Sequence, residues 1–392
     1  MRVTEHTPTA LRLAPEDLGY LLELVRRTGG TEESRVLEAL TPTRDPSVYE
    51  VTPGAYVGRL GLPSGDWIDF ASRFSFDDVI ELIRVSGRLQ VRTSTLAAPL
   101  GSAPFLAEVI AMAFVQEADR LVSRGLSKGY RSVRMTRPPY AGRLDVLHHV
   151  AHMAARPDRL ATIARRLSTN TPENQALAYA HEILRRTPLS RETSRGLAKL
   201  APVFARVSAR AATPMQVASI RLTNLTTRYR EALGLAELII RAHSLAPEGG
   251  GRSGVSLLFH MPKVWESYVA QWVRTEWTGY RVDAPYRFAL ASDGQTAEAD
   301  ITVWDGTKLL ALYDAKYKWP QSAPARDDLY QMVTYCERLG IAEATLVYPF
   351  HTPERTVWVG SRRVRVVGLR PRFGMKPSAL RSPSVPSATI AL

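Results

Sequence analysis

The chain has 392 residues, of which 51 are Lys or Arg and 38 are Asp or Glu, so its formal net charge is +13. This length excludes a mini-protein and allows roughly two or three domains, and an apolar fraction of 45% excludes a generally disordered chain. The single cysteine, Cys336, excludes a disulfide framework and a cysteine-rich zinc site, while the positive charge makes nucleic acid the first partner to consider.

The start of the chain does not resemble a secretory signal peptide, because acidic residues come early and no apolar core follows them. No segment approaches the run of about 18 apolar residues that a transmembrane helix requires. We therefore expect a cytoplasmic protein with no membrane partner.

Residues 1–95 combine a predicted helix at 15–28 with strand-like runs at 55–60 and 67–70. Turn-forming residues, Pro63-Ser-Gly-Asp, separate the two runs. This mixture predicts a small α/β module with a barrel-like arrangement.

Residues 96–245 are predicted to be a basic helical region, with successive amphipathic helices from about position 103. Between Arg120 and Arg166 there are eleven Lys and Arg against two Asp, a local charge of +9. Two interpretations stay open for this stretch: solvated helix faces, or a surface that follows the phosphate backbone of DNA.

Two further patterns in the chain resemble known sites without matching them. His148 and His152 share a predicted helix face, but the Glu of a metalloprotease helix is absent, so we interpret them as ordinary helix histidines. The glycines at 249–251 belong to a flexible linker at 246–254, and no phosphate-binding P-loop pattern occurs anywhere. We therefore expect no nucleotide-hydrolysing P-loop motor within this sequence.

Residues 255–370 are predicted to fold in the order α-β-β-β-α-β, with extra strands, and 371–392 to be a disordered tail rich in Ser, Pro and Ala. The predicted helices and strands of this region are a helix at 264–275, strands at 280–290, 299–304 and 309–317, a helix at 326–339, and strands at 344–347, 356–359 and 363–367.

A predicted β-hairpin carries the most informative residues. Asp305-Gly306 is a tight-turn signal between two apolar strands, so positions near 300 and 311 should face each other. Asp300 and Asp314 should then lie near the open end of the hairpin. Lys316 should lie on the same side as Asp314, because side chains alternate along a strand.

Two carboxylates and an ammonium group at a sheet edge suit phosphodiester hydrolysis. Carboxylate oxygens are the ligands that Mg²⁺ prefers, and a lysine can orient the attacking water or offset developing charge. We expect Mg²⁺ as the cofactor, with Mn²⁺ as a substitute. The alternative is a surface hairpin with polar ends, since Asp-x-Lys is a common pattern.

Three polar residues on flanking helices could complete the site. Glu266 follows an apolar stripe on the helix before the strands, while Gln331 and Tyr335 lie one turn apart on one face of the later helix. Each residue alone is more typical of a structural role.

Taken in order, Glu266, Asp300, Asp314-x-Lys316 and Gln331-x-x-x-Tyr335 resemble the PD-(D/E)xK nuclease superfamily. More closely, the chain resembles the McrC family, the nuclease subunits of McrBC modification-dependent restriction systems. The segments that carry this second resemblance are Asp314-Ala-Lys-Tyr-Lys318, Asp328-Leu-Tyr-Gln-Met-Val-Thr-Tyr335 and Leu346-Val-Tyr-Pro349, with weaker echoes at 56–58, 140–144 and 171–175.

The resemblance implies a multidomain α+β protein whose C-terminal part has a restriction-endonuclease-like core. It implies that Asp300, Asp314 and Glu266 hold Mg²⁺ and that Lys316 acts on the attacking water. Gln331 and Tyr335 would support the site or contact the DNA backbone. The sequence has Ala299 before Asp300, where the superfamily often has Pro; this departure is mild, because Asp300 supplies the ligand. It has Ala71-Ser-Arg where McrC-like chains often have a Pro-Lys pair, which suggests a specialised docking surface.

The expected function is that of a DNA endonuclease subunit in a restriction or phage-defence complex. It would cut double-stranded DNA together with an McrB-like AAA+ GTPase, docked through residues 1–95, and dimerisation through the nuclease domain stays open. Two alternatives remain: a stand-alone RecB-like repair nuclease, and a catalytically inactive DNA-binding adaptor.

Overall fold

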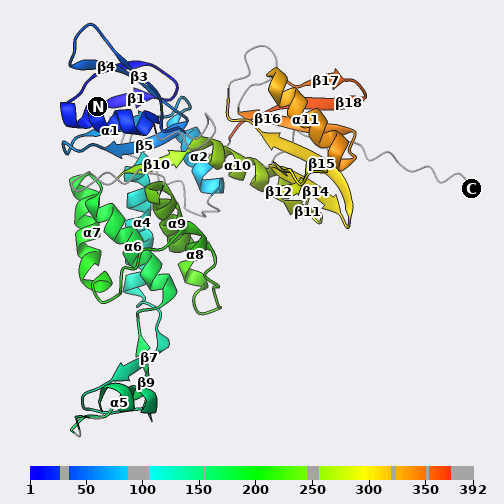
Figure 1. Ribbon diagram of the computed structural model, residues 1–392. Coiled ribbons are helices and arrows are strands. Elements are labelled where there is room, and N and C mark those ends of the chain that lie inside the picture. Colours follow the sequence, from blue (N-terminus) through cyan, green and yellow to red (C-terminus); the bar gives the residue numbers. More distant parts are fainter. Residues whose placement is uncertain are drawn as a thin grey trace, which may run out of the picture.

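The computed structural model describes residues 1–26, 35–86, 106–153, 155–156, 158–244, 256–318, 324–349 and 353–371. The expected boundary at 95–96, the glycine linker and all but the first residue of the expected tail lie outside these residues. The described residues form a mixed α/β structure in four parts (Figure 1). We call them the N-terminal module (1–75 and 257–260), the helical bundle (106–123 and 172–244), the arm (129–168) and the C-terminal domain (261–371).

The N-terminal module has two sheets around one apolar core. The four-stranded sheet has the order β1 (Arg2–Thr4), β6 (Trp67–Ala71), β5 (Tyr56–Gly61) and β10 (Leu257–His260). The three-stranded sheet has the order β2 (Thr9–Arg12), β4 (Val48–Pro53) and β3 (Leu37–Pro42). Helix α1 (Pro15–Arg26) buries Leu21 and Leu24 in the shared core. The predicted helix and both predicted strands of this part are confirmed.

The barrel-like expectation is wrong for the described strands. The chain leaves the first sheet at Thr4 and enters the second at Thr9, and no described strand of one sheet pairs with a strand of the other. Because pairing stops at this crossing, the strands form two sheets that share a core instead of a closed barrel.

Strand β10, which follows the linker, returns to the N-terminal module and pairs antiparallel with β5. Gly58 makes this possible: its φ is +138°, and a Cβ atom there would lie 2.1 Å from the carbonyl oxygen of Leu257. The chain that enters the C-terminal domain is therefore anchored first in the N-terminal sheet.

The helical bundle contains α4 (Leu106–Ser123), α6 (Pro172–Arg186), α7 (Arg191–Phe204), α8 (Pro214–Ala218), a 3₁₀ turn (Thr227–Tyr229) and α9 (Arg230–Ser244). Its amphipathic helices pack through buried side chains such as Phe114, Leu177 and Leu235. Pro172 begins α6, as the sequence pattern predicts. In the described part of the chain, no helix combines the length and the apolar character needed to cross a membrane.

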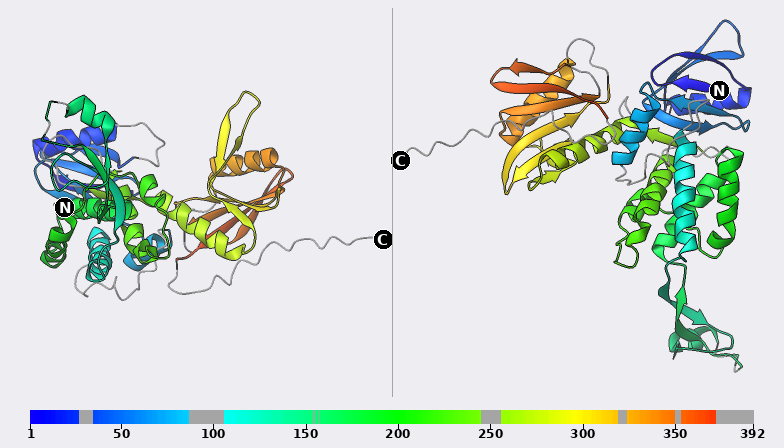
Figure 2. Two further views of the ribbon diagram at one scale, coloured as in Figure 1. Left: turned by 90° about the horizontal axis from the view of Figure 1, so that it is seen from below. Right: turned by 180° about the vertical axis from the view of Figure 1, so that it is seen from behind.

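The arm corrects the prediction that residues 103–245 form only successive helices. It contains β7 (Gly129–Met135), β8 (Arg143–Leu144), α5 (Val146–His152) and β9 (Thr162–Ser168). Strands β7 and β9 pair antiparallel over seven residues, from Gly129 opposite Ser168 to Met135 opposite Thr162. Local helix propensity is a weak guide here because this cross-strand pairing decides the structure. Figures 1 and 2 show the arm projecting from the end of the bundle, away from the C-terminal domain.

The C-terminal domain is a sheet with a helix on each face. The sheet has the order β11 (Arg281–Asp283), β14 (Ile301–Asp305), β15 (Lys308–Ala315), β16 (Glu343–Pro349), β18 (Arg362–Leu369) and β17 (Arg355–Val359). Strands β12 (Tyr286–Ala289) and β13 (Thr296–Ala299) form a separate pair. In sequence, α10 (Met261–Glu276), β11, β14, β15, α11 (Arg326–Leu339) and β16 follow the predicted order of helices and strands, with extra strands between and after them.

The two helices cover opposite faces of this sheet because the strand side chains alternate. Trp265 and Val269 of α10 pack with Ile301, whereas Met332 and Cys336 of α11 belong to a second cluster. Helix α10 also packs against α2 (Phe76–Ser86), the helix that follows the N-terminal module. Helix α10 therefore contacts both the C-terminal sheet and α2, which follows the N-terminal module in the chain.

The predicted hairpin is present, but its register differs from the prediction. Gly306 adopts a left-handed φ of 56° in the turn, and Asp305 pairs with Lys308. Because Asp305 pairs with Lys308, the turn lies one residue later than predicted, which moves the partner of each β14 residue by two positions. An irregularity after Val303 adds one further residue to β15, so Ile301 lies opposite Tyr313. Asp300 is therefore next to position 314 and not to 311, which brings the two aspartates closer than the two-residue-turn estimate implied.

Candidate active site

The carboxylates of Asp300 and Asp314 meet at one end of the C-terminal sheet. Asp314 lies near the end of β15 and is only 2% exposed. Asp300 occupies the bend before β14, where its Oδ2 accepts a hydrogen bond of 2.8 Å from the backbone N–H of Ala315. The bond ties the start of one strand to the end of its neighbour, so the hairpin itself positions both carboxylates.

Burial and repulsion raise the pKa of both groups. Desolvation first, and then the charge of Asp300, raise the pKa of Asp314 to about 7. Desolvation and then the charge of Glu266 raise the pKa of Asp300 to about 6. Three carboxylates thus act on one another, and a cation among them would relieve the repulsion.

Lys316 lies beside this pair. Its Nζ is 2.9 Å from Asp314 Oδ2 and donates a 2.9 Å hydrogen bond to Gln331 Oε1. Burial alone would lower the pKa of Lys316, but the carboxylates of Asp314, Asp328 and Asp300 outweigh it and raise the pKa above its usual value. In this arrangement Lys316 is an ammonium group that can donate hydrogen bonds and offset negative charge, and it is poorly suited to accept a proton.

Helix α11 supplies a hydrogen-bonded support for the lysine. Gln331 Nε2 donates to the hydroxyl of Tyr335 at 3.1 Å, and that hydroxyl donates to the backbone carbonyl of Glu298 at 3.3 Å. Both side chains lie on the face of α11 that covers the sheet, as their spacing of four residues predicts. The chain of bonds from Lys316 through Gln331 to Tyr335 fixes the ammonium group relative to the strand.

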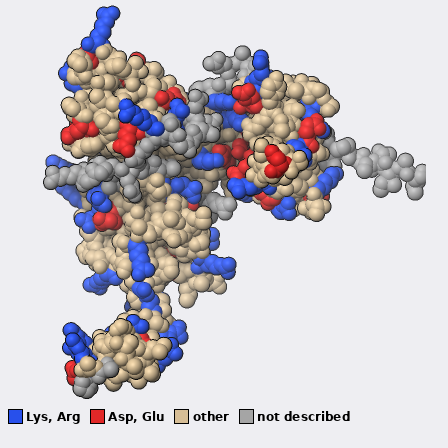
Figure 3. Space-filling model, in the orientation of Figure 1, with Lys and Arg blue, Asp and Glu red and all other residues tan. Residues whose placement is uncertain are grey.

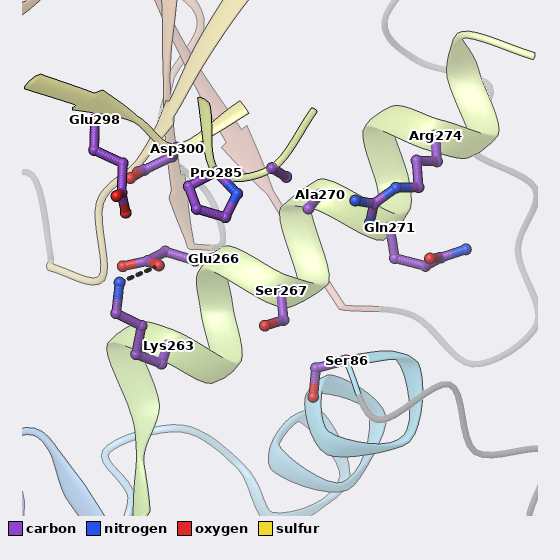
Figure 4. Close-up of a pocket in the computed structure, with 11 residues that line it drawn as sticks. Ser86, Lys263, Glu266, Ser267, Ala270, Gln271, Arg274, Pro285, Glu298 and Asp300 are labelled. Carbon is purple, nitrogen blue, oxygen red and sulfur yellow. Dashed lines mark hydrogen bonds and ion pairs between the residues drawn. The ribbon is translucent and has the colours of Figure 1, made fainter. Parts of the chain in front are cut away.

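Glu266 reaches the same region from α10. Figure 4 shows its carboxylate directed toward Asp300 and Glu298, while an ion pair of 2.6 Å joins it to Lys263. These groups border a cavity of about 310 Å³. The residues that line this cavity are Ser86, Lys263, Glu266, Ser267, Ala270, Gln271, Arg274, Ala284, Pro285, Glu298 and Asp300.

The structure therefore brings all six predicted site residues into one region, with Glu266 on the cavity side and Gln331 and Tyr335 on the α11 side. The sequence reasoning missed Lys263, Glu298 and Asp328. Asp328 is buried, accepts a 2.8 Å bond from Lys318 Nζ and a 2.9 Å bond from the Tyr348 hydroxyl, and lies 3.9 Å from Lys316 Nζ. Its spacing of three residues from Gln331 was the available signal.

The donor chemistry suits a hard divalent cation. Mg²⁺ prefers carboxylate oxygens and usually retains several waters, so two protein carboxylates with a third nearby are sufficient. Among the described residues, no three His, Cys, Asp or Glu side chains are already arranged around one point, and Glu266 is turned toward Lys263. The suitability of this site for a divalent cation therefore depends on Asp300 and Asp314, because a cation would relieve their mutual repulsion.

The histidines of the arm do not form such a site. The rings of His148 and His152 lie 4.6 Å apart on α5, as their predicted shared face requires. Desolvation first, and then the nearby charges of Arg134 and His152, lower the pKa of His148 below its usual value. Within the described chain no further Cys, Asp or Glu completes a metal-binding group with them.

Comparison with known proteins identifies the family. A family model described as McrBC 5-methylcytosine restriction system component matches residues 51–349. No curated protein matches the sequence.

Two solved structures are similar to this chain. The first is a refined half-complex from a tetradecameric assembly of Thermococcus gammatolerans McrB AAA+ hexamers with bound McrC; the TM-score is 0.60 at 14% identity, with 94% of each chain covered. The second is the Thermococcus gammatolerans McrBC complex, with a TM-score of 0.48 at 14% identity, covering 72% of this chain and 89% of that chain. Because the family model spans more than half of the sequence, the chain belongs to the McrBC 5-methylcytosine restriction system component family.

Proposed function

We propose that this protein is the Mg²⁺-dependent endonuclease subunit of an McrBC-type restriction system and that its C-terminal domain is a PD-(D/E)xK nuclease core. The observation that carries the proposal is the buried group of Asp300, Asp314 and Lys316 at the end of the β14–β15 hairpin. The order of elements around the group, from α10 to β16, is the order that the superfamily implies.

Asp300 and Asp314, with Glu266 alongside, would hold the Mg²⁺, or Mn²⁺ in its place. A bound divalent ion supplies charge neutralisation at a phosphate and lowers the pKa of a water. Lys316 donates hydrogen bonds from a fixed ammonium group, which suits a phosphate oxygen or the attacking water. Gln331 and Tyr335 hold that ammonium group in place.

The motor belongs to a partner, because this sequence has no P-loop pattern. The similar Thermococcus gammatolerans structure contains McrB AAA+ hexamers with bound McrC. We extend this association to the present chain: it binds an McrB-like AAA+ GTPase oligomer and cuts double-stranded DNA only in that assembly.

The arm is the surface that best suits such a partner. It exposes large apolar side chains, among them Tyr130, Leu147, Val150 and Leu167, of which Leu147 is 86% exposed. Tyr130 and Leu167 lie opposite each other in the β7–β9 pair. Large exposed apolar side chains are typical of protein interfaces and are not needed for phosphate contacts. We therefore favour the partner protein over DNA as the occupant of the arm and propose that the arm acts with the N-terminal module in docking.

The arm is also strongly basic. Arg131 lies directly opposite Arg166 in the β7–β9 ladder, an unfavourable pairing of like charges, and Figure 3 shows Lys and Arg side chains over the arm. An acidic surface on the partner would relieve this repulsion.

The test is a cleavage assay on methylated double-stranded DNA with the full chain, its AAA+ partner, GTP and Mg²⁺. We expect cleavage that requires all of these components and that stops when EDTA removes the metal. Cleavage by the chain alone would support the stand-alone repair nuclease. DNA binding without any metal-dependent strand scission would support the inactive adaptor and contradict the proposal.

A further inference from the structure

A buried polar cluster outside the candidate active site joins the N-terminal module to the residue that follows Lys316. Its members are Glu5, Ser72, Arg73 and Phe74 of the N-terminal module and Tyr317 of the C-terminal domain. Glu5 and Tyr317 are 312 residues apart in sequence, and Glu5 is only 2% exposed. Buried polar groups are costly unless they are paired, so this contact between domains is specific.

The N-terminal sheet explains how its half of the cluster forms. Strands β1 and β6 are parallel neighbours, with Thr4 opposite Ala71, so the residues that follow them emerge at the same edge. Glu5 follows β1 and accepts hydrogen bonds from the Ser72 hydroxyl at 3.2 Å and the Arg73 N–H at 3.1 Å. The module therefore presents a carboxylate and a guanidinium group side by side.

Tyr317 contacts both groups. Its hydroxyl donates to Glu5 Oε2 at 3.2 Å, and its backbone carbonyl accepts a 2.9 Å hydrogen bond from Arg73 Nη2. The Arg73 guanidinium carbon also lies 4.9 Å from the centre of the tyrosine ring, and the Phe74 ring packs edge-on at 5.3 Å. Burial raises the pKa of Tyr317 well above its usual value, so the hydroxyl keeps the proton that it donates.

The same short stretch of chain faces the active site on its other side. Asp314 and Lys316 extend toward α11, whereas Ala315 and Tyr317 belong to the cluster that includes α10. The Lys316 N–H donates a hydrogen bond of 2.9 Å to the Val347 carbonyl, and Arg73 donates to the carbonyl of the following residue, Tyr317. The C-terminal sheet thus holds the backbone of Lys316, and the N-terminal module holds the backbone of its neighbour Tyr317.

We propose that Arg73 and Tyr317, together with Glu5, are positioning residues for Lys316, so that the N-terminal module helps to build the nuclease site in addition to any docking role. This inference rests on the proposed nuclease function, because it concerns the geometry of that reaction. Because Tyr317 is the covalent neighbour of Lys316, its contact with Glu5 and Arg73 couples the position of the N-terminal module directly to that of Lys316. A displacement of about 1 Å at a reacting group can slow a reaction 10²-fold, so contacts of this kind affect the rate.

The test is single-turnover cleavage by the full chain in complex with its AAA+ partner, in which the amplitude reports the folded, active fraction and the rate constant reports positioning. We expect Arg73→Met to lower the rate constant roughly tenfold or more, with the amplitude unchanged. Arg73→Lys, which keeps a donor, should recover part of the rate. Tyr317→Phe, which removes only the hydroxyl, should lower it several-fold.

Tyr313→Phe is the matched control. It removes a hydroxyl from the same strand, where that hydroxyl accepts a 2.9 Å bond from Trp277 Nε1 inside the C-terminal domain. Its rate constant should stay within about twofold of the wild type, and partner-stimulated GTP hydrolysis should be unchanged in every variant. Rate constants for Arg73→Met and Tyr317→Phe equal to that of the control would overturn the link while leaving the nuclease proposal intact. Absence of cleavage by the wild-type complex would overturn both.

Discussion

The two most highly charged regions of the molecule use their charges in opposite ways. The candidate active site buries carboxylates and a lysine so closely that the pKa values of Asp300, Asp314 and Lys316 all rise. The arm carries eight Arg against two Asp between residues 129 and 168, a net charge of +6, on a surface with few buried residues around it. Substitutions in the first region should therefore alter chemistry and stability, whereas those in the second should alter association alone.

The largest effect is expected from Lys316→Met. This change removes the ammonium group between Asp314 and Gln331 and leaves the buried carboxylates without their nearest cation, so cleavage by the complex should fall roughly 10³-fold. Lys308→Met, in the exposed first position of the same strand, is the control and should cut normally. Equal activity of the two variants in a plasmid-cleavage assay would show that the buried lysine has no catalytic role.

A second prediction concerns stability and pH. Burial raises the pKa of Glu5 from 4.5 to about 7, so its protonated form is favoured in the folded state. Its contribution to stability is fully present below pH 4.5 and is lost as the pH rises to about 7, which amounts to about 3 kcal/mol.

Glu5→Gln should remove that pH dependence because glutamine does not titrate. In thermal unfolding from pH 4 to 8, the difference in Tm between wild type and variant should move in favour of the variant as the pH increases. A constant difference across this range would mean that Glu5 is not buried as an acid next to Tyr317.

Asp300→Asn should have a somewhat smaller effect on stability than Glu5→Gln. It should raise the free energy of unfolding and lower the cleavage activity. At pH 8 the variant lacks a carboxylate that is charged in spite of its burial and the repulsion of Glu266, so in the absence of metal it should be about 3 kcal/mol more stable than the wild type. The advantage should shrink as the pH falls below about 6 and disappear below pH 3.8, where Asp300 is protonated in both states. Mg²⁺ should raise the Tm of the wild type and not of the variant; stabilisation of both by Mg²⁺ would place the metal elsewhere.

The smallest effect on stability is expected in the arm. Leu147→Asp places a charge on a side chain that is 86% exposed, so the free energy of unfolding should change by less than about 0.5 kcal/mol. Binding to the AAA+ partner should nevertheless weaken, because an apolar contact is lost. Met215→Asp on α8, at an equally exposed apolar side chain of the bundle, is the control. Equal binding by both variants, measured by sedimentation or light scattering, would remove the arm from the interface.

Much of the C-terminal domain could be predicted because its signals are local. Helix α11 begins and ends where expected, since acidic residues occupy its first turn and Gly340 adopts the left-handed conformation that ends it. The Asp305-Gly306 turn likewise indicated the hairpin that brings the aspartates together. The site residues on this helix and this hairpin could therefore be predicted from the sequence.

The features that were missed depend on contacts distant in sequence. The extra residue after Val303 changes the register without any marked local pattern, and the arm's strands are decided by pairing across about thirty residues. The contact between Glu5 and Tyr317 joins residues 312 positions apart, and although Tyr317 belongs to the Asp314-Ala-Lys-Tyr-Lys318 motif, no pattern in the sequence pairs it with Glu5. A single sequence does not contain the information that would place these residues together.

The most direct test of the nuclease assignment compares Asp314→Asn with Asp305→Asn in metal-dependent cleavage by the full complex. The chemical change is the same and both residues belong to one hairpin, but Asp314 is buried in the site and Asp305 is exposed at the turn. We predict that Asp314→Asn lowers the single-turnover rate constant by roughly 10³-fold or more while GTP hydrolysis continues, and that Asp305→Asn cuts like the wild type. Cleavage by Asp314→Asn at the wild-type rate would contradict the account.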